Sequence, residues 1–246
     1  MINRLNDALR SRTFFKAISG LDVFDREAVL KVVRSAAAGG AHAVDVAADP
    51  EIVAQARQTA PGLIVFASAT DPRILVKSGA DVLELGNYDA MYRAGLEPTA
   101  EQVLDWTRAV VAATGGKVPL CVTIPGRLVR SAQVDLACRL QAAGADLLQT
   151  EGILGPRTPG VAGAITHLLE ALANTASVRE AVALPLILAG GVDPQNAPHA
   201  IAAGADGVGV GRFLKDAGTE SDMIEAVAQV RRSLATLREA GQPLKR

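Results

Sequence analysis

The chain has 246 residues and a formal net charge of -1, and 49% of its residues are hydrophobic while 3% are aromatic. This length and composition are typical of one globular domain, which we place at residues 1–246. The balanced charge supplies no basic surface for nucleic acid, and no apolar run approaches the roughly 20 residues that span a membrane. Because the first residues lack the apolar core of a signal peptide, we expect a cytoplasmic protein.

Two kinds of junction alternate along the chain. In the first kind a helical stretch ends at Gly-Ala and an apolar run follows at once, as at Gly40-Ala41, Gly79-Ala80, Gly144-Ala145 and Gly204-Ala205. Glycine just past a helix adopts the left-handed conformation that ends it, so each junction predicts a helix end and a strand start. In the second kind a proline precedes the apolar run, as at Pro61, Pro119 and Pro185. Proline cannot continue a helix, so these positions also predict new strands.

The apolar runs predict eight strands, each followed by enough residues for a helix. We place the strands at residues 14–19, 42–48, 62–68, 81–87, 119–125, 146–151, 185–190 and 206–211. Among the intervening helices, one begins near Asp25 with acidic residues in its first turn, and another begins at a capping Thr99. Strands alternating with helices indicate a parallel sheet, and eight such units in this length favour a single (β/α)8 TIM barrel of the phosphate-binding subtype. The alternative is an open, doubly wound sheet.

Polar residues near the carboxyl ends of the predicted strands form the candidate active site, because that end carries catalysis in this fold. A charged side chain facing the helix layer would be buried without water, which favours a position at the barrel mouth. We assign catalytic roles to Lys16, Asp45, Glu84 and Glu151. We assign substrate binding to Asp49, Asn87, Thr123 and Gln149.

Lys16 lies inside a strand otherwise made of Phe, Ala and Ile. A buried lysine must pair with a carboxylate, lose its proton or take part in chemistry, and burial is how Schiff-base lysines are activated. The first alternative is an ion pair with Asp45 or Glu84 that organises the barrel mouth. The second is covalent catalysis by the amine.

Two glycine-rich turns follow the last two predicted strands. They contain Gly190, Gly191, Gly209, Gly211 and the adjacent Arg212. In this fold such turns let backbone N–H groups and the start of a short helix bind a phosphate group. We therefore predict a phosphate-binding corner, with the tight strand exits that glycine permits as the alternative interpretation.

Other residues receive structural interpretations. Asp71 and Asp193 each precede a proline and are expected to cap helices, whereas Asp49 could cap a helix or bind substrate. Cys121 and Cys138 are expected to be buried thiols without a disulfide. The three histidines show no metal-ligand spacing, so we predict no metal site. The long loop that follows Glu151 is a candidate lid over the mouth, with Arg157 as an anion contact.

Several segments carry a more specific pattern, namely Lys16-Ala-Ile-Ser-Gly-Leu, Val44-Asp-Val-Ala-Ala-Asp-Pro50, Leu83-Glu-Leu-Gly-Asn-Tyr-Asp89, Leu148-Gln-Thr-Glu-Gly152 and Ala202-Ala-Gly-Ala-Asp-Gly-Val-Gly-Val-Gly211. In this order they resemble segments of the Ycf23 family, which is found in some plastid genomes, in cyanobacteria and in other bacteria. The resemblance implies a barrel fold and brings no established activity. The turn Ala189-Gly-Gly-Val-Asp193 differs from the Ser-Gly-Leu-Ser form associated with the family. The alanine-rich composition without a transit segment favours a bacterial source.

Three functions remain open from the sequence. The first is a cofactor-independent lyase, synthase or isomerase that acts on a phosphorylated small metabolite, with Lys16 and the carboxylates as catalytic groups. The second is an FMN-dependent oxidoreductase, because the same glycine-rich turns could bind the phosphate of the flavin. The third is a non-catalytic barrel that binds phosphate compounds. We expect a phosphorylated small molecule as partner, without nucleic acid or membrane, and leave homo-oligomer formation open.

Overall fold

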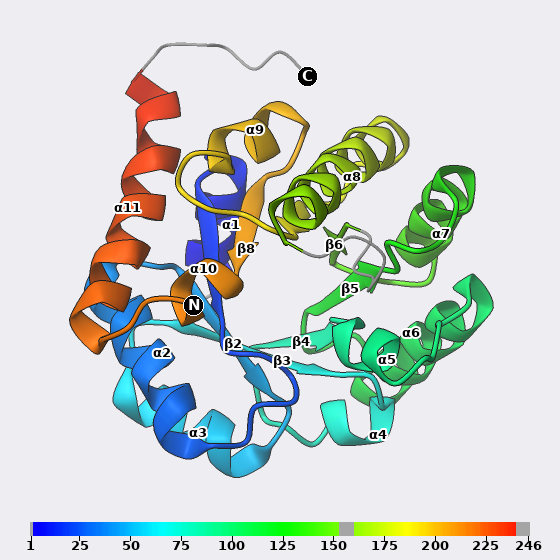
Figure 1. Ribbon diagram of the computed structural model, residues 1–246. Helices are drawn as coiled ribbons and strands as arrows, with labels where there is room; N and C mark the ends of the chain where they lie inside the picture. The colour runs from blue at the N-terminus through cyan, green and yellow to red at the C-terminus, as the bar shows by residue number, and fades with distance from the viewer. Residues whose placement is uncertain (1, 153–159, 240–246) are drawn as a thin grey trace.

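The protein is described by a computed structural model that covers residues 2–152 and 160–239 (Figure 1). Eight parallel strands close into a barrel in which β1 pairs with both β2 and β8, so the alternative of an open sheet is excluded. The strands are β1 (Phe14–Ile18), β2 (Ala43–Ala47), β3 (Ile64–Ala69), β4 (Val82–Leu85), β5 (Leu120–Ile124), β6 (Leu147–Thr150), β7 (Leu186–Ala189) and β8 (Gly207–Val210). Each lies within about two residues of the predicted position.

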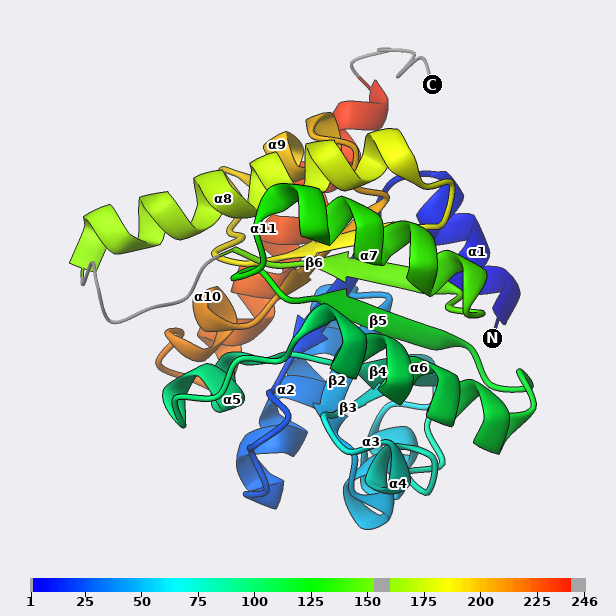
Figure 2. The same cartoon turned by 90° about the vertical axis from the view of Figure 1, so that its right-hand side faces the viewer.

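Helices cover the outer side of the barrel and lie at both of its ends (Figures 1 and 2). They are α1 (Ile2–Arg10), α2 (Arg26–Gly39), α3 (Pro50–Thr59), α4 (Pro72–Leu75), α5 (Asp89–Arg93), α6 (Ala100–Thr114), α7 (Arg130–Ala142), α8 (Gly160–Ala181), α9 (Ala197–Ala202), α10 (Arg212–Lys215) and α11 (Glu220–Glu239). The apolar residues on the outer faces of the strands pack against these helices in one continuous core. No helix in the described ranges is both long enough and apolar enough to cross a membrane.

The local signals in the sequence act as predicted. Asp25 accepts a hydrogen bond from the amide of Ala28 at the start of α2, and Thr99 and Gln102 form a reciprocal capping box at the start of α6. The glycines of all four Gly-Ala junctions have positive φ, at 84° for Gly40, 74° for Gly79, 96° for Gly144 and 108° for Gly204. The left-handed backbone that glycine permits follows the ends of α2, α7 and α9 directly and leads the chain into the next strand, whereas α4 ends at Leu75, before the turn that contains Gly79.

The amino end of the barrel is closed by α1, which the sequence did not predict. Leu5 and Leu9 on this helix are buried in a cluster with Phe14, Phe66 and other side chains that point into the barrel. Figure 2 shows α1 at one end of the barrel and the short helices α5 and α10 at the other. The polar mouth therefore lies at the carboxyl ends of the strands, and the opposite end is a hydrophobic seal.

Strand register brings the inward-facing polar residues to similar levels of the barrel. Ser68 is the partner of Glu84 across β3 and β4, and Thr123 is the partner of Gln149 across β5 and β6.

The expectation that both cysteines are buried is correct for one of them. Cys121 is buried and faces the barrel interior, whereas Cys138 on α7 is exposed because it lies on the outer face of that helix. Both are free thiols.

Candidate functional site

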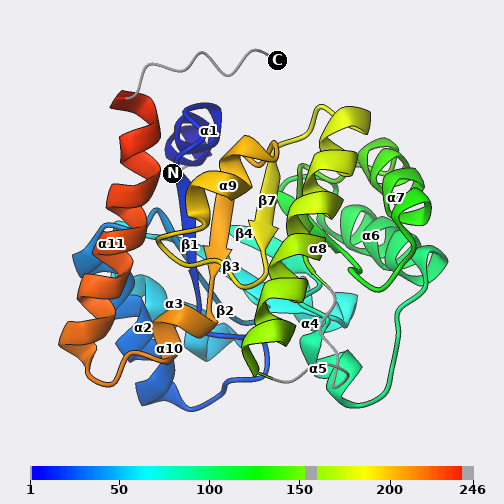
Figure 3. The same cartoon turned by 45° about the horizontal axis from the view of Figure 1, so that its top comes forward.

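A cleft of about 520 Å³ opens at the carboxyl ends of the strands. Its lining comes from the ends of β1, β7 and β8, from α10, and from residues that follow β4 and β6. Figure 3 shows β7 beside β8 and α10 at the end of β8, which is where the predicted phosphate corner lies. The volume lies within the usual range for small-molecule sites.

Lys16 and Glu84 form an ion pair inside the barrel, with both side chains fully buried. The ammonium also lies 4.8 Å from the centre of the Phe66 ring. Burial disfavours the ammonium, but attraction by Glu84 and by Asp45 outweighs burial, so the pKa of Lys16 is raised above its usual value. Lys16 is therefore a charged partner of Glu84 beneath the cleft, and neither side chain lines the cleft itself.

Asp45 is a second buried carboxyl group next to this pair. The hydroxyl of Ser68 donates to its Oδ1, whereas Oδ2 has no hydrogen-bond partner in the described chain. Burial first, and then repulsion by Glu84, raise the pKa of Asp45 to about 7, although Lys16 and Ser68 act in the opposite direction. Near neutral pH this carboxyl group is thus poised to gain or lose a proton.

Gln149 connects the buried pair with the cleft. Its Nε2 donates to Oε1 of Glu84 at 2.9 Å and to Oγ1 of Thr123 at 3.1 Å. The side chain is only 2% exposed, yet it lines the cleft, and its Oε1 has no partner among the described residues. Thr123 is itself fully buried, does not line the cleft and accepts the hydrogen bond from Gln149.

Glu151 places a carboxylate at the edge of the cleft. Its Oε1 accepts hydrogen bonds from the Tyr92 hydroxyl at 2.8 Å and from the Gly126 amide at 3.1 Å. The pKa of Tyr92 is raised, mainly by burial and secondly by the negative charge of Glu151, so the phenol stays protonated and remains a hydrogen-bond donor. These bonds hold the carboxylate in one position against the cleft, as acid–base chemistry requires.

The glycine-rich corner exposes backbone donors to the cleft. Gly191 has a φ of 69°, a conformation that other residues rarely adopt, and Gly211 is the N-cap residue of α10. The amides of Val192, Arg212 and Phe213 make no hydrogen bond with any other described residue, and all three residues line the cleft. Free N–H groups gathered at one wall of a cleft are typical of an anion site.

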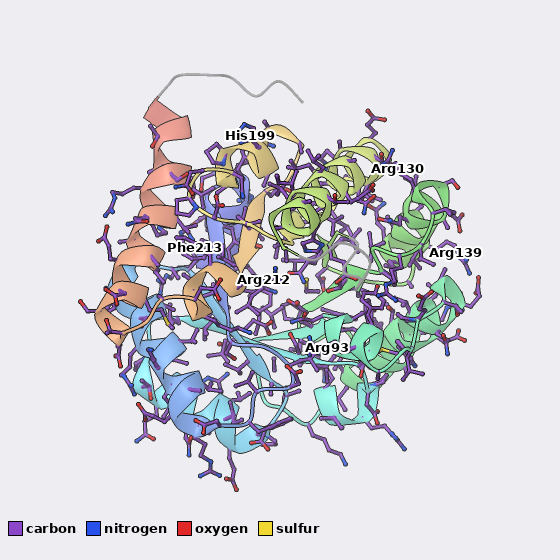
Figure 4. All side chains as sticks on the ribbon, viewed as in Figure 1. Arg93, Arg130, Arg139, His199, Arg212 and Phe213 are labelled. Atoms are coloured by element: carbon purple, nitrogen blue, oxygen red, sulfur yellow. The ribbon has the colours of Figure 1, made fainter. Side chains whose placement is uncertain are left out.

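Three cationic side chains lie around the same opening. Arg212 and Lys215 come from α10, and neither forms an ion pair within the described chain. Arg93 comes from α5 and pairs with Asp22, which also lines the cleft. Figure 4 labels Arg93 and Arg212, which project from different elements around the middle of the barrel. Their positive charge would favour an anionic ligand.

Two of the predicted substrate-binding residues have different environments. Asn87 lines the cleft and has a φ of 66°, which is uncommon for a residue other than glycine. Asp49 does not line the cleft, because its carboxylate caps α3 by accepting from the amides of Glu51 and Ile52. Our assignment of Asp49 to substrate binding is therefore replaced by the capping role, which Asp71 also has at α4.

The sequence interpretation missed His167, which lies on α8 and lines the cleft while only 6% exposed. It packs so closely on the loop after β6 that a Cβ atom at Gly152 would lie 2.0 Å from the His167 carbonyl oxygen. A Cβ atom at Gly190 would lie 3.0 Å from its Nε2. The glycines at positions 152 and 190 were the available signal, because glycine permits the close approach of another segment. They do not identify His167 as the residue that approaches. Lys215 and Arg93 were missed as well.

The candidate lid cannot be placed, since residues 153–159, including Arg157, lie outside the described residues. Within residues 2–152 and 160–239 no group of three or more His, Cys, Asp or Glu side chains is arranged to hold a metal ion.

The other glycines of the predicted phosphate corner, Gly190, Gly209 and Gly211, all line the cleft.

Comparison with known proteins identifies sequence relatives along almost the whole chain. Residues 1–239 match a family model described as "Protein of unknown function (DUF561)". The chain is similar to "Uncharacterized protein ycf23" of Cyanophora paradoxa, with 31% identity over 237 residues that cover 94% of this chain and 96% of the relative. It is also similar to the protein of the same name from Antithamnion sp., with 30% identity over 90% of this chain and 84% of the relative.

Solved structures share the fold at low sequence identity. Thiamine phosphate pyrophosphorylase from Pyrococcus furiosus has a TM-score of 0.63 and 19% identity, over 93% of this chain and 98% of that chain. A 3-hexulose-6-phosphate synthase has a TM-score of 0.65 and 18% identity, over 89% and 99%. A truncated 3-deoxy-D-arabino-heptulosonate 7-phosphate synthase from Thermotoga maritima has a TM-score of 0.62 and 15% identity, over 92% and 87%. At these identities the likeness establishes the barrel fold alone.

Proposed function

We propose that this chain, which belongs to the Ycf23 family, is an enzyme that acts on a phosphorylated small metabolite as a lyase, synthase or isomerase. One observation carries the proposal: among the described residues, a single cleft combines backbone amides that lack acceptors on one wall with a carboxylate that accepts hydrogen bonds from Tyr92 and Gly126 on another. The names of the structural neighbours, which include two synthases of phosphorylated sugars, are consistent with this class of reaction.

The phosphate group of the substrate would lie against Gly191 and Gly211. There the amides of Val192, Arg212 and Phe213 can donate to its oxygens, and the Arg212 guanidinium adds a charged contact. Neither glycine contributes a side-chain contact to this phosphate site. The phosphate would thus fix the substrate in the cleft while leaving its reacting part to reach the other wall.

The chemical groups at that other wall are Glu151 and His167. Both are almost buried and both line the cleft, so either can exchange a proton with a substrate atom bound between them. The restraints on Glu151 from Tyr92 and Gly126 favour a fixed general base. We propose proton transfer by these two groups as the core of the mechanism.

Lys16, Asp45 and Glu84 would support this chemistry from beneath the cleft. The ion pair with Glu84 and the raised pKa of Lys16 keep the ammonium charged, whereas an imine forms only from the neutral amine. The buried network therefore favours an electrostatic role for Lys16 over covalent catalysis. Lys16→Arg retains the charge without the ability to form an imine, so retained turnover in that variant and no adduct after borohydride treatment are expected.

The phosphate site is tested by replacing Gly211. A Cβ atom there would lie 3.5 Å from Ile18, an ordinary contact, so a side chain can be added without disturbing the fold. Gly211→Asp places a negative charge beside the phosphate, and like charges about 4 Å apart repel by roughly 4 kcal/mol near a protein surface. We expect inorganic phosphate binding, measured by calorimetry, to weaken by roughly a hundredfold or more.

Gly211→Asn is the matched control, since it has the same shape without the charge and should weaken binding much less. Equal binding of phosphate by the wild type and by a folded Gly211→Asp variant would exclude this corner as the phosphate site. A flavin absorbance band in the purified protein would instead support the oxidoreductase. Phosphate binding without turnover of any phosphorylated metabolite in a broad screen would support a binding protein.

A further inference from the structure

The orientation of the Gln149 side-chain amide is determined by its neighbours. Its Nε2 is 2.9 Å from Glu84, whose carboxylate is paired with the Lys16 ammonium and can only accept hydrogen bonds. The second Nε2 hydrogen is directed to the Thr123 hydroxyl. Exchange of the amide oxygen and nitrogen would place an oxygen against the carboxylate, so the ion pair holds Oε1 on the opposite side.

The amide oxygen of Gln149 is an acceptor without a donor. It has no hydrogen-bond partner among the described residues, and the side chain that carries it is almost completely buried while lining the cleft. Buried polar atoms are almost always paired, so an unpaired one in a ligand cleft indicates a ligand group that pairs with it.

No donor among the described residues lies within hydrogen-bond distance of this oxygen, which lies close to the backbone of Gly209. A Cβ atom at Gly209 would lie 3.5 Å from it, 2.9 Å from Ile18 and 3.1 Å from Ala189. The apolar side chains of Ile18 and Ala189 flank the wall at Gly209, and this wall continues along β8 into the phosphate corner at Gly211. A ligand anchored by its phosphate at that corner would pass along this wall to reach Gln149.

We propose that Oε1 of Gln149 accepts a hydrogen bond from a hydroxyl or N–H group of the substrate. This inference rests on the proposed function and narrows it: the substrate carries a phosphate and, beyond an apolar contact with Gly209, a hydrogen-bond donor. A carboxylate or keto oxygen at the same place would face Oε1 as a second acceptor and would be disfavoured. Lys16 and Glu84 are then positioning residues, which act on the substrate only through the amide.

The first test removes the acceptor. Gln149→Met has nearly the same shape without the carbonyl. Gln133→Met is the matched control, because Gln133 is equally buried but donates to the backbone carbonyls of Gly126 and Leu128 and does not line the cleft. The probes are inorganic phosphate and a set of sugar phosphates, each with its matched deoxy analogues that lack one hydroxyl group. Dissociation constants are measured by calorimetry for the wild type and both variants.

We expect the wild type to bind at least one sugar phosphate roughly ten- to a hundredfold more tightly than one of its deoxy analogues, the effect of leaving a buried polar group unpaired. Gln149→Met should lose this preference while its affinity for inorganic phosphate is unchanged, and Gln133→Met should keep both. Glu84→Gln should reduce the preference as well, since an amide at that position no longer imposes one orientation on Gln149.

The outcomes separate the two proposals. The role of Gln149 would be overturned if the wild type bound inorganic phosphate but showed no preference for any sugar phosphate over its deoxy analogue. It would also be overturned if Gln149→Met kept that preference. In both cases the proposed function would stand. A preference retained in full by Glu84→Gln would overturn the positioning role of the ion pair. A wild-type protein that binds no phosphate at all would overturn the proposed function and this inference together.

Discussion

Asp45→Asn should make the protein more stable at alkaline pH and leave its stability at acidic pH nearly unchanged. The pKa of Asp45 rises from 3.8 to about 7 on folding, mainly because of burial and then repulsion by Glu84. A carboxyl group whose pKa is raised by folding contributes stability that is complete below its unfolded pKa and is lost as the pH rises through the folded value. At 1.36 kcal/mol per pH unit, the wild type loses roughly 2 to 3 kcal/mol from this group between pH 5 and pH 8. The amide side chain of the variant cannot titrate, so the variant avoids that loss.

The assay is denaturant unfolding of both proteins across this pH range. The difference in unfolding free energy, variant minus wild type, should increase by roughly 2 to 3 kcal/mol from pH 5 to pH 8. The amide keeps an acceptor for Ser68, so the bond to its hydroxyl can persist. Asp105→Asn is the control, because Asp105 is exposed on α6 and makes only a surface ion pair. A pH-independent difference, or one that decreases with rising pH, would refute the buried, proton-binding state assigned to Asp45.

The remaining predictions concern stability as well. Lys16→Met should destabilise the fold by about 3 to 5 kcal/mol, because it leaves the buried Glu84 carboxylate without its cationic partner. Adding Glu84→Gln should recover most of the loss in thermal unfolding, and a double variant no more stable than Lys16→Met would contradict the pairing. Gly86→Ala should cost roughly 2 to 4 kcal/mol, since φ is 139° and the new Cβ atom would lie 2.3 Å from the Thr123 Cβ. Gly79→Ala, with positive φ but open space around it, should cost clearly less, and equal losses would show that the close contact is unimportant.

The barrel could be predicted because its signals are local and repeated. Each Gly-Ala junction requires a left-handed residue in a short stretch of chain, and the structure has that conformation at all four. The helix caps at Asp25 and Thr99 are equally local. The seal formed by α1 was not predicted, because the partners of Leu5 and Leu9 come from several strands that are distant in sequence.

The candidate site was only partly predictable for the same physical reason. Their positions near the carboxyl ends of the predicted strands indicated that Asp45, Glu84 and Gln149 belong to the barrel mouth, but their depth depends on how the barrel closes. Closure of the barrel places Asp45 and Glu84 below the cleft and leaves Gln149 in the lining of the cleft. His167 escaped prediction because a residue in the middle of a long helix ordinarily faces solvent or the outer core. Asp49 was ambiguous in sequence, since capping and ligand binding favour the same residue at the end of a strand.

The depth of Lys16 also bears on the type of reaction. A Schiff-base lysine has to meet the substrate carbonyl and has to lose its proton first. Here the nitrogen is fully buried, its proton is held by Glu84, and the amide of Gln149 lies between that pair and the cleft. Covalent catalysis would require the Lys16 side chain to leave its ion pair. The buried carboxylate of Glu84 would then lack its cation, at a cost of several kcal/mol. Acid–base chemistry by Glu151 requires no such rearrangement, because its carboxylate already lines the cleft. The arrangement of charges therefore supports the proposed proton transfer over imine formation by Lys16.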